Sequence, residues 1–326
     1  MVLSEMDSRP LHADPGTWTP HSRVRALSAP QNARNWRELW NQFGNPMPQK
    51  YARHCQLNSY SIVSDVYRPI VLSMNWTRDQ LLLALNLYFQ TPFGKQDKNY
   101  PPIIALGERI GRSAGAVAMK LSNFTSLDPA EKARGIRGLS GASKLDREIW
   151  DEFSSNLNEL AAQSEALIES SPVTEEAVSD YDHEETPVPS GPSEEAGLTK
   201  RRLQQRFFRR VVLASYGGRC CITQLPAKEL LRASHIIPWA ESEEHRANPQ
   251  NGLCLSATYD AAFDRGLISI DEEYRIICSP SLSTNYMTET SMQAHFLDLV
   301  GRKISLPEKN FPSQVFLERH RARWNF

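Results

Sequence analysis

The sequence predicts an α+β protein, with an N-terminal all-α, helix-turn-helix-like domain at residues 74–155 and a C-terminal ββα domain at residues 200–326. Residues 156–199 begin as a helical segment and continue as an acidic linker. Three observations predict this division. Apolar residues recur at helical spacing in the first domain, strand patterns precede a helix in the last, and ten acidic residues without a lysine or arginine lie from Glu165 to Glu195. An acidic segment nearly free of aromatic residues is typical of a disordered linker.

The first 73 residues give no fold signal beyond a short helix around Trp36–Phe43. They are rich in proline, serine, arginine and asparagine, and their apolar residues follow no sustained period. We expect residues 1–73 to form a poorly structured extension. An alternative stays open, in which the protein starts at Met74, where the helical pattern begins.

The composition favours a globular protein of the cytoplasm. Apolar residues make up 40% of the chain, which is enough for packed cores. The five cysteines are odd in number and show no C-x-x-C spacing, so a reducing compartment is the simpler expectation. The longest apolar run, Leu81 to Phe89, is too short to span a bilayer, and the N-terminus lacks the pattern of a secretory signal. We therefore expect no membrane association.

Helix-starting and helix-ending residues organise the first domain. Thr77 and Gln80 have the spacing of a capping box in front of an apolar helical face. A second helix, Ile103–Ile110, is stopped by Gly111, and Ser113 can cap a third helix. Two short helices around a glycine turn predict helix-turn-helix geometry.

Three cations accompany this helical pair. Arg109, Arg112 and Lys120 are expected on or near its exposed side, where Arg112 and Lys120 could contact DNA. The alternative is a small helical bundle in which basic residues only add solubility. Both interpretations stay open.

A basic helix is predicted directly after the linker. Apolar residues recur at positions 203, 207 and 211, and no acidic residue lies between Lys200 and Arg219. The cations expected to contact DNA phosphates are Lys200, Arg201, Arg202, Arg206, Arg209 and Arg210. The alternative is a solvated face without a ligand. The acidic segment before this helix could also occupy its basic face when DNA is absent.

A ββα unit follows the basic helix. We expect a hairpin between Cys221–Thr223 and Leu230–Ile237, with Pro238 ending the second strand. After a polar loop, Asn248 or Asn251 can cap a helix. The apolar residues expected on that helix are Leu253, Leu255, Tyr259 and Phe263.

Three residues of this unit have the chemistry for phosphodiester hydrolysis. His235 lies on the expected strand, and a histidine can deprotonate water because its pKa lies near neutrality. Asn251 can bond to the backbone across the loop and hold that base in position. Asp260, on the helix, can bind a divalent cation that neutralises charge on phosphate. A lone histidine would more simply be a core residue; the three together favour catalysis.

These residues resemble the HNH endonucleases, in the branch that lacks zinc-binding cysteines. The resemblance covers about Lys200 to Phe326, and its most specific stretches are Ser234–Trp239, Asn251–Leu255, Phe263–Ile268 and Phe316–Arg321. It implies that His235 is the general base and that Asn251 is the middle asparagine of the motif. It places Asp260 where the family has its final histidine or asparagine, a metal ligand.

Two departures from the family pattern concern metals. Many members have Asp or His as a second ligand directly before the base, where this chain has Ser234, whose hydroxyl is a poor ligand for a hard cation. Metal binding would then depend on Asp260, waters and the substrate phosphate, with Mg²⁺ expected and Mn²⁺ or Ni²⁺ as alternatives. The resemblance gives Asp264 a structural role at the Arg265–Gly266 turn. We expect no structural zinc, and Cys254 as a small buried residue of the helix.

The block from Trp76 to Phe124 also resembles a helical domain found ahead of such nucleases in bacteria. The leading hypothesis is a metal-dependent DNA endonuclease of bacterial restriction or defence, in which residues 74–155 select the target. A non-catalytic DNA-binding regulator and a nuclease of RNA or branched DNA are the alternatives. The sequence determines neither the target nor the oligomeric state, and leaves a homodimer open.

Overall fold

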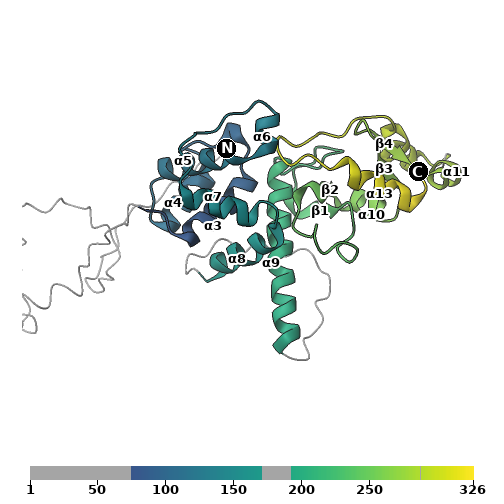
Figure 1. The fold of residues 1–326 in the computed structure, drawn as a ribbon. Coiled ribbons are helices and arrows are strands. Elements are labelled where there is room, and N and C mark those ends of the chain that lie inside the picture. Colours follow the sequence, from purple (N-terminus) through teal and green to yellow (C-terminus); the bar gives the residue numbers. More distant parts are fainter. Residues whose placement is uncertain (1–74, 171–191, 287) are drawn as a thin grey trace, which may run out of the picture. The chain divides into compact units, whose positions relative to one another are not determined.

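The computed structural model describes residues 75–170, 192–286 and 288–326, which are coloured in Figure 1. Over these residues the fold is α+β, as predicted. Helices make up the N-terminal part, and two small antiparallel sheets lie among helices in the C-terminal part. None of the described helices is long and apolar enough to cross a membrane.

The expectations for the start of the chain lie outside the described residues. They concern the extension at 1–73, its helix around Trp36–Phe43 and the alternative start at Met74.

The N-terminal helices begin and end where their capping residues predict. They are α3 (Arg78–Gln90), α4 (Pro101–Ile110), α5 (Ala114–Leu127), α6 (Pro129–Ala133), α7 (Lys144–Phe153) and α8 (Leu157–Glu169), with a 3-10 turn, η2, at Phe93–Lys95. Thr77 and Gln80 form the capping box of α3. Gly111, at φ 67°, ends α4, and the Ser113 hydroxyl accepts a hydrogen bond from the Ala116 N–H. The predicted helical pair around a glycine turn is confirmed.

Helix α3 supplies much of the N-terminal core. Its Leu81, Leu85 and Tyr88 are fully buried, and the helix packs on α5, α7 and α8. The Tyr88 ring packs edge-on against Trp150 of α7, and its hydroxyl donates a 2.6 Å hydrogen bond to Asp128. Burying each such side chain contributes about 1.5–3 kcal/mol, so this core is a main source of stability.

The long helix α9 (Pro192–Ser215) uses two apolar faces. Phe207 and Val211 pack into the N-terminal helical core. Phe208 and Val212, one position further on, pack into the core of the C-terminal part. Helix α9 therefore runs between the N-terminal helices and the first C-terminal sheet (Figure 1) and contacts both.

The linker predicted at 156–199 contains ordered helix at both ends. Helix α8 occupies its beginning because Leu160 and Ala161 give that helix an apolar face, which packs on α3 and α9. Helix α9 begins at Pro192, earlier than the predicted Lys200. The described residues from Asn75 onward belong to one compact unit, so contacts cross the boundary drawn from the sequence. Independent folding of residues 200–326 stays a prediction.

The C-terminal part is built on a ββα unit. Its elements are η3 (Lys228–Leu230), β1 (Leu231–His235), η4 (Pro249–Asn251), β2 (Gly252–Ser256), α10 (Ala257–Asp264), β3 (Ile268–Ile270), β4 (Ile276–Cys278), α11 (Pro280–Asn285), α12 (Thr290–His295), η5 (Leu297–Leu299) and α13 (Gln314–Trp324). Strand β1 pairs with β2 in antiparallel register, and α10 packs on both strands. Strands β3 and β4 form the second sheet.

The composition of the hairpin differs from the prediction. The partner of β1 is β2, not Cys221–Thr223, which contributes one bond from the Cys221 N–H to the Cys254 oxygen at 2.7 Å. Residues 253–255, expected on the helix, are strand residues. They are completely buried because α9 and α10 both pack on this hairpin, and a strand covered on both faces shows no polar alternation. Asn251 accordingly precedes a strand and does not cap a helix.

Candidate active site

His235, at the end of β1, is held in one tautomer. Its Nε2 lies 2.9 Å from the backbone oxygen of Arg246. A carbonyl oxygen only accepts hydrogen bonds, so Nε2 carries a proton and donates it. In the neutral ring the basic lone pair then belongs to Nδ1, and the ring is half-exposed. Nδ1 is therefore the atom that can accept a proton from water.

The ring of His235 stacks on a phenylalanine from another element. Its centroid lies 3.7 Å from that of Phe208 on α9, with 10° between the planes. The cross-strand partner of His235 is Gly252, and a Cβ at this glycine would lie 2.4 Å from Val212 and 3.0 Å from Phe208. The missing side chain gives α9 the room to approach the hairpin. The stacking thus fixes the plane of the imidazole.

Asn251 fixes the loop that follows β1. It is 1% exposed, and its Oδ1 accepts a 2.7 Å hydrogen bond from the Ile237 N–H. Its Nδ2 donates to the Ile237 oxygen at 3.1 Å and to the His245 oxygen at 3.3 Å. The His245 carbonyl directly precedes Arg246, whose own carbonyl holds His235. Asn251 therefore connects both ends of the loop, and its role in positioning the base stays a prediction.

A second asparagine supports the same loop from the N-terminal part. Asn158 of α8 donates a 2.6 Å hydrogen bond to the Glu243 oxygen and accepts a 2.9 Å bond from the Ala247 N–H. Ala247 is fully buried in the N-terminal helical core. Helix α8, which lies in the segment predicted to be a linker, thus contacts the loop on both sides of Arg246.

Asp260 and Asp264 lie one turn apart on α10. Partial burial of its carboxyl group, together with the neighbouring charge of Asp260, raises the pKa of Asp264 to about 6. The turn after Asp264 is closed by a backbone hydrogen bond from Gly266 to Phe263, and Gly266 adopts a φ of 64°. Among the described hydrogen bonds none joins the Asp264 carboxylate to this turn, and the structural role of Asp264 stays a prediction.

Ser234 is buried, and its hydroxyl is without a hydrogen-bond partner among the described residues. Neighbouring residues of a strand point to opposite faces, so Ser234 faces away from His235. The two carboxylates on α10 are oxygen donors, which fit a hard divalent cation that keeps several waters. No group of three or more His, Cys, Asp or Glu residues within the described ranges could hold a metal ion.

The cysteines of the C-terminal part are thiols in a packed core. Cys220, Cys221 and Cys254 are buried, and Cys254 lies on strand β2 and not on the predicted helix. Burial raises the pKa of Cys254 to about 12 and that of Cys221 well above its ordinary value. Thiols that resist ionisation act as small apolar residues, because metal binding needs the thiolate. The absence of a structural zinc stays a prediction.

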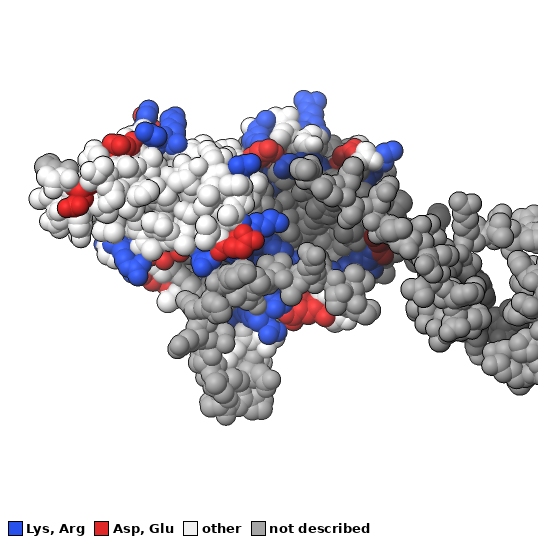
Figure 2. Space-filling view, turned by 180° about the vertical axis from the view of Figure 1, so that it is seen from behind, with Lys and Arg blue, Asp and Glu red and all other residues white. Residues whose placement is uncertain are grey.

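The basic face of α9 contacts the acidic residues of α8. The ion pairs join Arg202 and Arg206 to Glu169, Arg210 to Glu165, and Lys200 to Glu159. Arg209 donates to the backbone oxygen of Leu231 at 3.0 Å. On the face shown in Figure 2, Lys and Arg side chains stand beside Asp and Glu and form no continuous basic patch. Nucleic acid would have to compete with these internal partners, so phosphate contact by this helix stays a prediction.

The cations of the helical pair are also occupied. Lys120 is 7% exposed and lies 2.8 Å from Asp146, so its expected position on the exposed side is wrong. It is buried because α5 packs between α3 and α7. Arg112 donates to the Gln80 side chain at 3.0 Å and lies over the Trp76 ring. Lys120 is the one lysine or arginine of α5, so this helix presents no exposed cation to DNA.

Several site residues could not be found from the sequence. Phe208 and Arg246 contact His235, but nothing in the local pattern connects either residue to it. A second aromatic, Trp239, lies edge-to-face with His235 at 5.7 Å. A signal for Phe208 existed in the adjacent pair Phe207–Phe208, since two neighbouring large apolar residues on a helix must face different surroundings.

His320 of α13 shows that the geometry of His235 is not unique to the site. Its ring stacks on Phe263 at 3.7 Å, Nε2 donates to the Phe263 oxygen, and Nδ1 accepts from the Ser269 hydroxyl. Burial lowers the pKa of His320 to about 4. His320 is buried, whereas His235 is half-exposed, and this difference makes His320 a structural residue.

The comparison with protein families agrees with the site. Residues 220–271 match the family model described as HNH endonuclease, a stretch that contains His235, Asn251 and Asp260. None of the curated proteins compared with the chain matches it. The chain thus has an HNH endonuclease domain at residues 220–271, which indicates a phosphodiester hydrolase with a nucleic-acid substrate.

Proposed function

We propose that this protein is a metal-dependent endonuclease that hydrolyses DNA phosphodiester bonds, with His235 as the general base. The observation that carries the proposal is the hydrogen bond from Nε2 to the Arg246 oxygen. It leaves the basic lone pair of the neutral ring on Nδ1, where it can accept a proton from the attacking water. A positioned base of this kind typically contributes about 10²–10⁴-fold to the rate.

The residues around His235 keep that base in place. Stacking on Phe208 sets the plane of the ring, and the Arg246 carbonyl sets its rotation. Asn251 bonds to both ends of the loop that carries this carbonyl. Asn251 is therefore proposed as a positioning residue, and its substitution should lower kcat more than it raises KM.

Asp260 and Asp264 are proposed to hold the divalent cation that HNH nucleases generally use, and Mg²⁺ is the first candidate. When bound, such a cation neutralises the charge that develops on phosphate and on the leaving oxygen. A carboxylate pair one helical turn apart suits this task because a cation relieves both the burial of the Asp264 carboxylate, the main cause of its raised pKa, and the repulsion from Asp260. Ser234 is a weaker candidate, since serine is a poor ligand.

DNA is proposed as the substrate because a helix-turn-helix pair is typical of proteins that bind it. Restriction or defence is the biological role we propose, with residues 74–155 contributing to target choice. The buried Lys120 makes α5 a weak reader of phosphates, so target choice would use other residues of that part.

The test is incubation of the purified full-length protein with supercoiled plasmid, structured RNA and branched DNA in Mg²⁺, Mn²⁺ or Ni²⁺. We expect nicked and linear plasmid with metal and none after chelation, and Asp260→Asn should need more metal for the same rate. Cleavage of RNA or branched DNA alone would reassign the substrate. Binding without cleavage in every metal would favour the non-catalytic regulator.

A further inference from the structure

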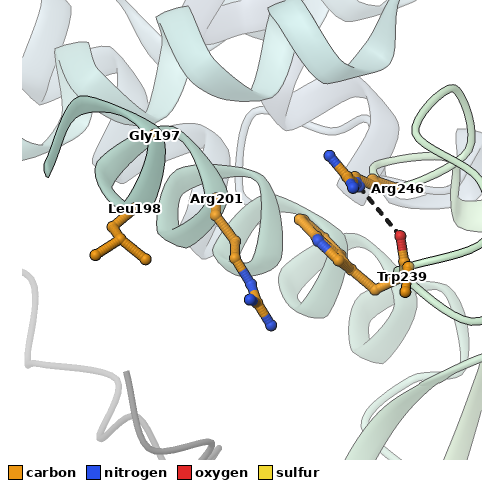
Figure 3. A pocket seen from close by; sticks show the side chains of 6 residues that line it. Gly197, Leu198, Arg201, Trp239 and Arg246 are labelled. Atoms are coloured by element: carbon orange, nitrogen blue, oxygen red, sulfur yellow. Dashed lines mark hydrogen bonds between the residues drawn. The ribbon is translucent and has the colours of Figure 1, made fainter. Parts of the chain in front are cut away.

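A hollow opens next to His235, between the beginning of α9 and the loop that follows β1. Its volume is about 510 Å³, within the range typical of small-molecule sites, and its lining comprises Gly197, Leu198, Arg201, Trp239, Ala240 and Arg246. Figure 3 shows the Arg201 and Trp239 side chains extending toward the same open space. The hollow is therefore formed by two segments that are distant in sequence.

The lining combines an aromatic ring with two positive charges. Both guanidinium groups lie over the Trp239 ring, with the carbon of Arg201 at 5.7 Å and that of Arg246 at 5.0 Å from its centre, so a base stacks on this ring where a guanidinium makes room for it. The six lining residues include no carboxylate. The ion-pair partner of Arg246 is Glu243, at 3.5 Å, whose side chain is 86% exposed. An aromatic face beside guanidinium groups is the combination that binds unstacked nucleotides, because the ring stacks on a base and the cations bind phosphate.

The hollow is directly connected to the proposed base. Trp239 lies 5.7 Å from the ring of His235, and the two planes are nearly perpendicular. Arg246 contributes its carbonyl to His235 and donates from Nε to the Trp239 oxygen at 3.2 Å, the bond dashed in Figure 3. The hollow is therefore within reach of a nucleotide next to a scissile phosphate at His235.

We propose that the hollow binds one nucleotide of the substrate strand, next to the scissile phosphate, with its base turned out of the helical stack and placed on Trp239. Arg201 and Arg246 bind the phosphate of that nucleotide. The proposal rests on the proposed nuclease function and assigns its substrate class. The enzyme prefers DNA that has an unpaired or extruded base at the cleavage site, since such a base costs least to unstack.

The test measures binding without cleavage, in full-length protein that carries His235→Ala. Fluorescence anisotropy compares a short DNA duplex with the same duplex containing one unpaired adenine. We expect tighter binding of the duplex with the unpaired base. Trp239→Leu, introduced into the same His235→Ala protein, should lower the affinity for the duplex with the unpaired adenine about tenfold, because base stacking on an aromatic ring is lost. Binding of the intact duplex should stay unchanged. Trp239→Phe should keep most of the preference.

Arg201→Gln should weaken binding of the duplex with the unpaired base more than that of the intact duplex and reduce the salt dependence of the former by about one released counterion, because Arg201 binds the phosphate of the extruded nucleotide. The matched control is Arg202→Gln, the next residue on α9, whose side chain bonds to Glu169 away from the hollow. It should leave the preference for the unpaired base intact. Circular dichroism establishes that each variant is folded.

An equal loss for both duplexes in Trp239→Leu would overturn the proposal, because the ring would then act on the backbone or on folding. A preference that survives in both Trp239 variants would also overturn it. These outcomes differ from a failure of the nuclease proposal, which would show as an absence of cleavage by the unsubstituted protein.

Discussion

Replacing Asn251 tests how the active-site loop is held. Asn251→Ala removes the three hydrogen bonds to Ile237 and His245; the Ile237 backbone groups lose these partners, whereas the His245 oxygen keeps its bond from the Asn248 N–H. At about 1 kcal/mol for each bond, the free energy of unfolding should fall by about 3 kcal/mol. A typical domain has about 5–15 kcal/mol of stability, so the variant should still fold.

Asn251→Asp makes a sharper version of the same test. A carboxylate can still accept from the Ile237 N–H, but its second oxygen would face the carbonyl oxygens of Ile237 and His245, where the native amide donates. The protonated acid can donate to one of them, so folding raises the pKa of the introduced carboxyl group above its unfolded value of about 3.9. A raised folded pKa gives stability that is fully present below about pH 3.9 and is lost as the pH rises through the folded pKa.

Urea unfolding, followed by circular dichroism from pH 5 to pH 8, measures both effects. The difference in the free energy of unfolding between the native protein and Asn251→Asp should increase with pH. The difference between the native protein and Asn251→Ala should stay constant. In cleavage assays both variants should lose kcat with little change in KM. Two results would refute the role assigned to Asn251. One is a loss of unfolding free energy in Asn251→Asp that does not change with pH, and the other is native stability and native kcat in Asn251→Ala.

Three other predictions concern the support of His235 and a second histidine. Gly252→Ala should cost about 1–3 kcal/mol of stability and lower kcat, because its Cβ would push against Phe208; unchanged kcat would refute the coupling. Asn158→Ala should lower kcat severalfold because it releases the loop around Arg246. The control is Asn156→Ala, which removes only a helix cap, and equal losses of kcat in the two variants would contradict the role of Asn158 in the loop. Burial lowers the pKa of His320 to about 4, so the native protein should lose stability as the pH falls from about 6.5 to about 4, a loss that His320→Gln should lack in urea unfolding.

The sequence predicted the parts of the fold that local chemistry determines. Thr77, Gly111 and Ser113 set helix ends through bonds and backbone angles within a few residues, and the structure has those ends. A strand was predicted at Leu230–Ile237 for the same reason, because apolar and turn residues mark it within a short window, and the structure has a strand at Leu231–His235.

The remaining features depend on partners that are distant in sequence. Strand β2 has an apolar run that fits either a strand or a helix, and only the packing of α9 and α10 on its two faces makes it a strand. The sequence of helix α9 was interpreted as one apolar stripe that packs into a single core. In the structure Phe207 packs into the N-terminal core and Phe208 into the C-terminal core. The burial of Lys120 follows from Asp146 on another helix, which no local pattern reveals.

The central claim is that His235 is the base of a phosphodiester hydrolase. Single-turnover cleavage of plasmid DNA by His235→Ala, with DNA binding measured in parallel, tests it most directly. His295→Ala, at an exposed position on α12, is the matched control. We expect a loss of at least about 100-fold in rate for His235→Ala, with unchanged DNA affinity and a fully active control. Near-native cleavage by His235→Ala would contradict it.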